Sequence, residues 1–389
     1  MHVPGRRRRH LLVLTSLAVV LAASGGATAA AKPQRADPLQ QGVDAIRDTG
    51  AVGVFAEASS PDAREVARAG TAKRGTDRPM PWNGRFRIGS ATKTFTATVV
   101  LQLVGEGRMS LDDTVERWLP GVVRGNGNDG GRITVRQLLQ HTSGVPDALP
   151  RIAALNSAAG YRAERFRTYT PGELVETALR DAPTMPSPGD EWSYSNTNYV
   201  LAAMIVREVT GRSWADEVED RIIRPLGLEG TSVPGAFPFV PGPHARSYAS
   251  FRTDTDTDTD TGIDVTTLNP SMGVGSGSII STAHDLNRFY TALLGGRLLE
   301  PAQLDAMTTT VPAPQLGVNY GLGLGELPLS CGGSYFGHLG ELLGYHTLAG
   351  VTRDGTRTAV VYVTSDGGPD TQKAMNTLVD RELCRGEES

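Results

Sequence analysis

The stretch RFRIGSATKTFTATVVLQLVG, residues 85–105, joins an extended segment to an apolar helical run and places Ser90 at the junction. Lys93 follows three residues later, so on a helix its amine lies one turn from the Ser90 hydroxyl and on the same face. The chain has only four lysines among its 38 basic residues, and a buried lysine can release a proton that an arginine keeps. Ser90 and Lys93 therefore predict a serine nucleophile activated by an amine. The alternative is a helix-capping serine followed by a solvated lysine.

The first thirty residues have the pattern of a secretory signal peptide. Four arginines at 6–9 precede an apolar run at 11–23, and Ala27-Thr28-Ala29 fits a cleavage site. The apolar run is too short to favour a membrane-spanning helix, and no cysteine follows it to carry a lipid. We therefore expect a signal peptide at 1–29 and a secreted protein with no stable membrane anchor.

The composition excludes some classes of partner. The net charge is −4, and loss of the four leader arginines would make it −8, with 34 basic against 42 acidic residues. An acidic chain lacks the basic patches that nucleic acid requires, so we expect no nucleic-acid partner. The scattered histidines contain no ligand pair at helical spacing, so we expect neither a metal nor a cofactor. We also expect a monomer.

The order of predicted elements indicates an α/β (α+β) fold with an inserted helical domain. About 360 residues after the leader exceed one ordinary core. Sheet-like segments and the Ser90 helix fill 30–110, helical patterns dominate 111–262, and sheet returns in 263–389. The individual predictions are helices at 36–49, 92–105, 134–141, 172–181, 196–209, 213–222 and 282–294, strands at 51–58, 63–72 and 84–89, a hairpin of 342–351 with 356–364 around residues 353–355, and a final helix capped by Asp370. Thr282 and Asp285 are expected to form a capping box at the start of the helix at 282–294.

The tract TDTDTDTDT, residues 253–261, is of low complexity, and we expect a disordered surface insertion. A calcium site is the alternative, but the tract lacks the glycine and the terminal glutamate of a calcium loop. The two cysteines, Cys331 and Cys384, are expected to form a disulfide in an exported chain. The alternative is two inert buried thiols.

Two further motifs suit a hydrolase built on Ser90. Tyr194 and Asn196 lie in the helical block, and a nearby ammonium would ease ionisation of the tyrosine for acid–base work. The segment Gly337-His338-Leu339-Gly340-Glu341 enters the late sheet, where its glycines allow close backbone approach. The backbone N–H groups of Ser90 and Glu341 are expected to form an oxyanion hole. The alternative for Tyr194 and Asn196 is an ordinary buried tyrosine and a helix-capping asparagine. The alternative for His338 is a strand histidine whose hydrogen bonds are satisfied within the protein.

The succession Ser-x-x-Lys, Tyr-x-Asn, His-x-Gly resembles the penicillin-recognising serine hydrolases, which include D-alanyl-D-alanine carboxypeptidases, class C β-lactamases and esterases. The resemblance extends to LLQHTSGVPD at 138–147, PLGL at 225–228 and STAHDL at 281–286. It implies a β-lactamase/transpeptidase-like fold, with an antiparallel sheet flanked by helices. It further implies acylation of Ser90, proton transfer by Lys93 and Tyr194, and substrate binding by Asn196, His338 and Gly340, with His338 in place of the family's lysine.

One departure concerns the substrate. Leu339 occupies the position of the family's threonine, whose hydroxyl is expected to bind the substrate's carboxylate. The leading expectation is a D,D-carboxypeptidase that acts on peptidoglycan stem peptides, with β-lactams as inhibitors. An esterase or a class C-type β-lactamase acting on another small acyl substrate is the first alternative, and a non-catalytic binding protein is the second.

Overall fold

The computed structural model describes residues 1–2, 37–251 and 262–385. The predicted signal peptide, beyond its first two residues, and the Thr-Asp tract therefore lie outside the described residues. The chain from Asp37 onward forms one compact unit. Within the described ranges, no helix has the length and apolar character needed to cross a membrane.

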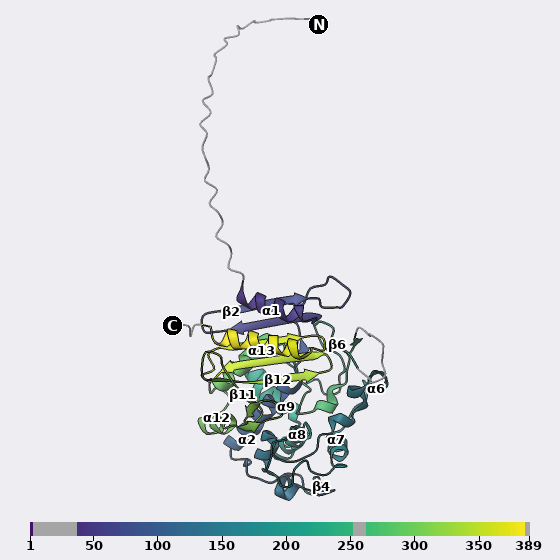
Figure 1. Ribbon diagram of the computed structural model, residues 1–389, viewed down its shortest axis with the longest axis vertical. Helices are drawn as coiled ribbons and strands as arrows, with labels where there is room; N and C mark the ends of the chain where they lie inside the picture. Colours follow the sequence, from purple (N-terminus) through teal and green to yellow (C-terminus); the bar gives the residue numbers. More distant parts are fainter. Residues whose placement is uncertain (3–36, 252–261, 386–389) are drawn as a thin grey trace. The chain divides into compact units, whose positions relative to one another are not determined.

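An eight-stranded antiparallel sheet forms the upper part of this unit in Figure 1. Its strand order is β2-β1-β14-β13-β12-β11-β10-β9, so an N-terminal hairpin pairs with the last strand of the chain. Its strands are β1 (Gly53–Ser59), β2 (Arg64–Gly70), β9 (Val311–Ala313), β10 (Val318–Tyr320), β11 (Gly325–Pro328), β12 (Ser334–Leu342), β13 (Tyr345–Thr352) and β14 (Thr358–Val363). The predicted union of two distant sheet halves is therefore present.

One face of the sheet is covered by α1 (Pro38–Asp48) and α13 (Pro369–Leu383), which lie side by side in Figure 1. The predicted amphipathic helix is confirmed as α1, which buries Leu39, Val43 and Ile46 against alternate strand residues. The predicted cap of the last helix is wrong. Gly368 precedes α13 and Asp370 lies within its first turn, because Pro369 already starts the helix.

The opposite face packs on α11 (Ala283–Leu294) and leads into the helical region that lies below the sheet in Figure 1. The helix α2 (Thr92–Gly105), predicted with these bounds, is buried on almost every side and packs against α8 (Thr197–Thr210). The remaining helices are α3 (Val115–Trp118), α4 (Val135–Gln140), α5 (Ala153–Asn156), α6 (Ala158–Glu164), α7 (Pro171–Ala178), α9 (Trp214–Val218), α10 (Arg224–Leu226) and α12 (Pro301–Thr308).

Short strand pairs join these layers. The predicted strand at 84–89 is only β3 (Phe86–Arg87), and it pairs with β8 (Ile280–Ser281) instead of joining the main sheet. The other short pairs are β4 (Arg124–Gly125) with β5 (Asn128–Asp129), and β6 (Tyr248–Ala249) with β7 (Ile263–Asp264). The prediction of a longer strand failed because the chain turns into a helix immediately after Ile88.

Thr282 caps α11 through a hydrogen bond from the Asp285 N–H, as predicted. The reciprocal half of the predicted capping box is absent, because the Asp285 carboxylate accepts hydrogen bonds from Gly230 and Thr231 instead. The hairpin predicted around residues 353–355 is confirmed as β13–β14. Its first strand begins at Tyr345, because Leu343 and Gly344 form a tight turn with positive φ angles of 36° and 73°.

Cys331, between β11 and β12, is disulfide-bonded to Cys384 at the C-terminal end of α13. The bond closes a loop with a sequence separation of 53 residues and ties the last helix to the strand that carries the His-x-Gly motif.

Replacing both cysteines by alanine is expected to lower the free energy of unfolding by about 2–4 kcal/mol, because the unfolded chain regains loop entropy. Urea unfolding at 25 °C of the double variant and of the wild type would measure this difference. A thiol count on denatured, unreduced wild-type protein is the control. Two free thiols in that count would contradict the bond.

Candidate active site

The turn that carries Ser90 is held against β12 by two glycines. Residues 89–91 form a short 3₁₀ turn before α2, and Gly89 has a φ of +51°. A Cβ on Gly89 would lie 2.7 Å from the backbone of Glu341, and one on Gly340 would lie 2.0 Å from the Ile88 oxygen. A side chain at either position would clash with the backbone opposite, so the close approach of the Ser90 turn to β12 requires glycine at both positions. Gly340, predicted to bind substrate, thus has a packing role against the nucleophile turn.

Ser90 lies at the centre of a hydrogen-bonded group. Its Oγ is 3.1 Å from Lys93 Nζ and 2.8 Å from Tyr194 Oη. Lys93 Nζ also donates to Asn196 Oδ1 at 2.7 Å and to the Ser276 carbonyl oxygen at 3.0 Å. Ser90 is half-buried, whereas the Lys93 side chain is completely buried. The structure therefore brings Ser90, Lys93, Tyr194 and Asn196 together.

The charge state of this group follows from burial. Burial lowers the pKa of Lys93 to about 7, against the opposing effect of the Asp147 carboxylate. Burial raises the pKa of Tyr194, and the carboxylates of Asp147 and Glu341 add to this rise, while its hydrogen bond to Ser90 opposes it. The expectation that Lys93 eases the ionisation of Tyr194 is therefore not met in the resting site. At neutral pH a neutral phenol stands beside an amine that titrates near neutrality.

Asn196 does not cap α8 with its side chain, although it occupies the N-cap position. Its Oδ1 accepts from Lys93, and its Nδ2 donates to Asp147 Oδ2 at 2.9 Å. Both ends of the amide are thus used to link Lys93 to a carboxylate. Sequence reasoning missed Asp147, although this residue ends the segment at 138–147.

His141 is a second residue that sequence reasoning missed. Its ring is buried against Tyr194, with ring centroids 4.3 Å apart. Its Nδ1 lies 3.2 Å from the backbone N–H of Ser195, and its carbonyl oxygen accepts from Ser193. Burial holds the pKa of His141 well below its usual range, so the ring is neutral. His141 therefore positions the loop that presents Tyr194.

His338 is buried in β12, only 6% exposed, and its Nε2 lies 2.9 Å from Tyr320 Oη. Burial lowers the pKa of His338 to about 3, so this ring cannot take over the charge of the family's lysine. No hydrogen bond joins it to Ser90, Lys93 or Tyr194 in the described part of the chain. Its expected contact with substrate stays a prediction, and its hydrogen-bond partner Tyr320 is a residue that sequence reasoning missed.

Leu339 lies on the other face of the sheet. Its side chain packs with the α1 and α13 cluster, because successive strand side chains point to opposite faces. The expectation that the missing hydroxyl affects carboxylate binding stays a prediction.

The end of β12 presents the predicted oxyanion-hole group. Leu342 and Tyr345 are the pair that closes the two-residue turn between β12 and β13. Glu341 and His346 are the next pair along the two strands, away from the turn. Hydrogen-bonded and non-hydrogen-bonded pairs alternate in such a ladder, so the Glu341 N–H points away from β13. Gly89 lies on that side. Together with the N–H of Ser90 at a helix start, this arrangement suits an oxyanion hole.

The Glu341 side chain extends to the surface beside a charged cluster. Its carboxylate lies 3.3 Å from His346 Nδ1, and His346 Nε2 lies 3.8 Å from Asp366. The two carboxylates raise the pKa of His346 to about 9 against the opposing effect of burial, so this ring is a cation at neutral pH. Across the described ranges no group of three or more His, Cys, Asp or Glu side chains is placed to hold a metal ion.

Comparison with known proteins places this geometry in a family. The family model described as Beta-lactamase matches residues 31–383. A D-stereospecific amidohydrolase from Streptomyces sp. is 44% identical, with a TM-score of 0.80 over 87% of this chain and 97% of that one. The D-amino acid amidase from Ochrobactrum anthropi SV3, complexed with D-phenylalanine, is 29% identical, with a TM-score of 0.77 over 90% and 99% of the two chains.

The putative penicillin-binding protein PbpX of Bacillus subtilis is 26% identical over 284 residues, which are 71% of this chain and 61% of that protein. Penicillin-binding protein 4* of the same organism is matched over only 32% of its length, so this chain spans less than two thirds of these curated relatives. The predicted fold and resemblance are confirmed by the family match and the solved structures. The chain belongs to the beta-lactamase family of serine hydrolases.

Proposed function

We propose that this protein hydrolyses amides of D-amino acids through an acyl-enzyme on Ser90. The observation that carries the proposal is the buried amine of Lys93, 3.1 Å from Ser90 Oγ, with a pKa of about 7. A general base with a pKa near 7 can both accept and release a proton at neutral pH. The substrate class is supported by the likeness to the Streptomyces amidohydrolase and the Ochrobactrum amidase.

The reaction uses the observed contacts in order. The neutral Lys93 amine accepts the Ser90 proton as Oγ attacks the amide carbon. The N–H groups of Ser90 and Glu341 donate to the developing oxyanion. Tyr194, protonated and 2.8 Å from Oγ, donates to the leaving nitrogen as the C–N bond breaks, and the proton on Lys93 restores it. Water then hydrolyses the ester, which releases the D-amino acid and restores the Ser90 hydroxyl.

The charges around the nucleophile favour a substrate without a carboxylate. Asp147 and Glu341 both act on the Tyr194 hydroxyl, whereas His338 is neutral. The cation of His346 is already shared by Glu341 and Asp366. An added substrate carboxylate would be repelled, whereas a free ammonium or a neutral amide would be accepted.

The D,D-carboxypeptidase, predicted first from the sequence, becomes the second candidate, together with the esterase and class C-type β-lactamase activities. The likeness to PbpX, a putative penicillin-binding protein, favours it. For the D,D-carboxypeptidase, the ligands would be peptidoglycan stem peptides as substrates and β-lactams as inhibitors. Export to the cell-wall space and a monomeric state remain part of the proposal, and the leader-like pattern of residues 1–29 supports the export.

A substrate comparison separates these activities. We expect D-phenylalanine amide to be hydrolysed at least tenfold faster than L-phenylalanine amide, and faster than D-alanine is released from a D-Ala-D-Ala peptide. Ammonia and D-alanine assays measure the rates, and fluorescent penicillin tests labelling of Ser90. Ser90→Ala should abolish turnover of every substrate. Faster release of D-alanine, with penicillin labelling, would establish the carboxypeptidase instead.

Replacing Lys93 by arginine is expected to lower kcat by about 10²–10⁴-fold, because arginine keeps a cation but cannot accept the Ser90 proton. Steady-state rates on the best substrate measure the loss. The matched control is Lys73→Arg, which makes the same change at an exposed lysine and should keep full activity. Comparable activity in the Lys93 variant would exclude Lys93 as the base.

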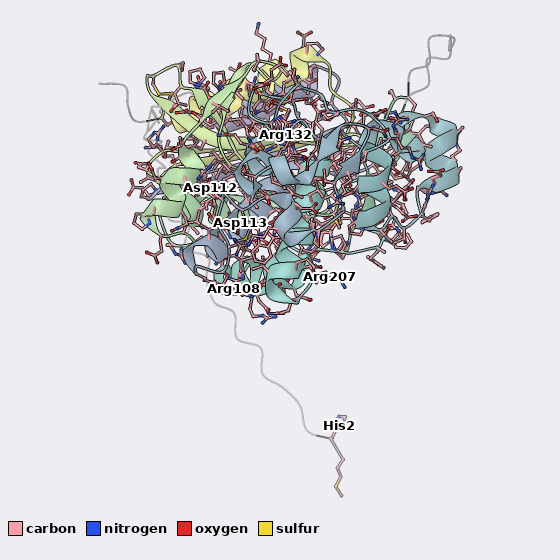
Figure 2. The ribbon with its side chains drawn as sticks, turned by 90° about the horizontal axis from the view of Figure 1, so that it is seen from below. His2, Arg108, Asp112, Asp113, Arg132 and Arg207 are labelled. Carbon is pink, nitrogen blue, oxygen red and sulfur yellow. A yellow bond between two sulfur atoms is a disulfide. The ribbon has the colours of Figure 1, made fainter. Side chains whose placement is uncertain are left out.

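The pH profile should report Lys93. Below its pKa of about 7 the amine is protonated and cannot accept a proton, so kcat/KM should fall as pH falls through this value. Asp147→Asn removes the carboxylate that raises this pKa, so the midpoint should move to lower pH. The control is Asp112→Asn, at an exposed residue labelled in Figure 2 that pairs with Arg136. An unmoved midpoint in the Asp147 variant would argue against this assignment.

A further inference from the structure

Three separated segments of the chain meet at the end of β12, where the predicted oxyanion-hole group lies. The turn after β12 is bonded to a residue next to β6, because the Leu343 carbonyl oxygen accepts a hydrogen bond from Ser247 Oγ at 3.0 Å. Asp366, between β14 and α13, is bonded to the same region. Its backbone N–H donates to the Tyr248 carbonyl oxygen at 3.1 Å, and its carboxylate accepts from the Ser250 N–H. Asp366 is therefore a fixed carboxylate beside the end of β12.

His346, the second residue of β13, lies between this fixed carboxylate and Glu341. Its Nδ1 is 3.3 Å from the Glu341 carboxylate, and its Nε2 is 3.8 Å from the Asp366 carboxylate. Its side chain is only 17% exposed, and its register partner on β14 is the apolar Val363. A neutral imidazole donates from one ring nitrogen only, and an ionised carboxylate only accepts. Carboxylates that face both nitrogens therefore favour the doubly protonated, cationic ring.

Within the described residues, Glu341 and Asp366 are the charged groups that act on this ring. Burial opposes the charge, but the two carboxylates outweigh it and raise the pKa of His346 to about 9. The cluster therefore carries one positive and two negative charges at neutral pH. When the pH rises through about 9, the ring loses its proton and the two carboxylates are left without a cation between them.

The backbone of Glu341 connects this ion cluster to the nucleophile. Its N–H points away from β13, toward the turn of Ser90, whereas its carboxylate meets His346. The fit on the Ser90 side leaves little free space, since a Cβ on Gly89 would lie 2.7 Å from the Glu341 nitrogen. An oxyanion-hole donor is effective only at hydrogen-bond distance from the developing charge. The ion pairs of His346 thus hold a residue whose backbone position matters for catalysis.

We propose that His346 is a positioning residue of the oxyanion hole, whose cation binds Glu341 to Asp366 and so holds the Glu341 N–H against the turn of Ser90. Loss of the ring proton in alkaline solution loosens the end of β12 and lowers turnover. The ion pairs are fully present below the ordinary histidine pKa and are lost as the pH rises through about 9. The inference rests on the proposed acylation of Ser90, but not on which acyl substrate reacts there.

The pH dependence of kcat, measured at saturation with the best substrate, tests this role. In the wild type, kcat should fall as the pH rises through about 9, a range in which Tyr194 stays protonated because burial raises its pKa. His346→Lys keeps a cation with an ordinary pKa of about 10.4, so the fall should move up by about one pH unit. A free α-amine titrates at about 8, so only a fall that moves with the variant is assigned to His346.

His346→Gln removes the cation and should abolish this alkaline fall. At neutral pH it should lower kcat about tenfold at constant KM, because the contact is made in the transition state. This loss is smaller than the roughly 10²–10³-fold that removal of an oxyanion-hole donor costs. Asp366→Asn removes one of the carboxylates that raise the pKa of His346, so the fall should move to lower pH. His244→Gln is the matched control, because the ring of His244 meets only its own loop at the Gly242 carbonyl oxygen, and it should keep the wild-type profile.

An alkaline fall with the same midpoint in the wild type, His346→Lys and Asp366→Asn would overturn the inference. A rise in KM at constant kcat in His346→Gln would place His346 in ground-state binding of the substrate and would also overturn it. Where His346→Gln does not fold, as judged by circular dichroism, the shifts of the lysine and asparagine variants decide. Hydrolysis of another acyl substrate with the expected shifts would change the proposed function and support this inference.

Discussion

The buried amine of Lys93 is the point at which three separated segments of the chain meet. It binds the Ser90 hydroxyl, the Asn196 amide and the Ser276 carbonyl, which come from the start of α2, the start of α8 and the turn before β8. Burial disfavours the ammonium form, while Asp147 favours it. The balance leaves a group that can lose or gain a proton near neutral pH. The surrounding fold must therefore hold all these partners in place.

The main sheet supports the turn that carries Ser90. Because Gly89 and Gly340 carry no side chains, β12 reaches the turn of Ser90 and presents the Glu341 N–H there. The strand is held in register by β11 and β13, and the loop before it is bonded to α13 by the disulfide of Cys331. The candidate acylation site is thus assembled from an early helix and a late strand, which the eight-stranded sheet brings together.

The proposed choice of substrate rests on the charges around the nucleophile. His338 is neutral because it is buried beside Tyr320, so the site lacks the fixed cation that the family's lysine would provide. Asp147 and Glu341 add negative charge near the phenol. The proposed preference for amides with a free amine over peptides that end in a carboxylate rests on these charges.

The sequence by itself determined the local elements and the order of the motifs. The helix at 92–105, the amphipathic helix around Leu39 and the hairpin at 353–355 were predictable, because periodicity and turn residues act over a few positions. The roles of Asp147 and His141, the orientation of Leu339 and the neutral state of His338 were not. Each depends on which face a strand buries, on partners distant in the sequence, and on desolvation, which raises or lowers a pKa only once the residue is enclosed. Those features were decided by the tertiary structure alone.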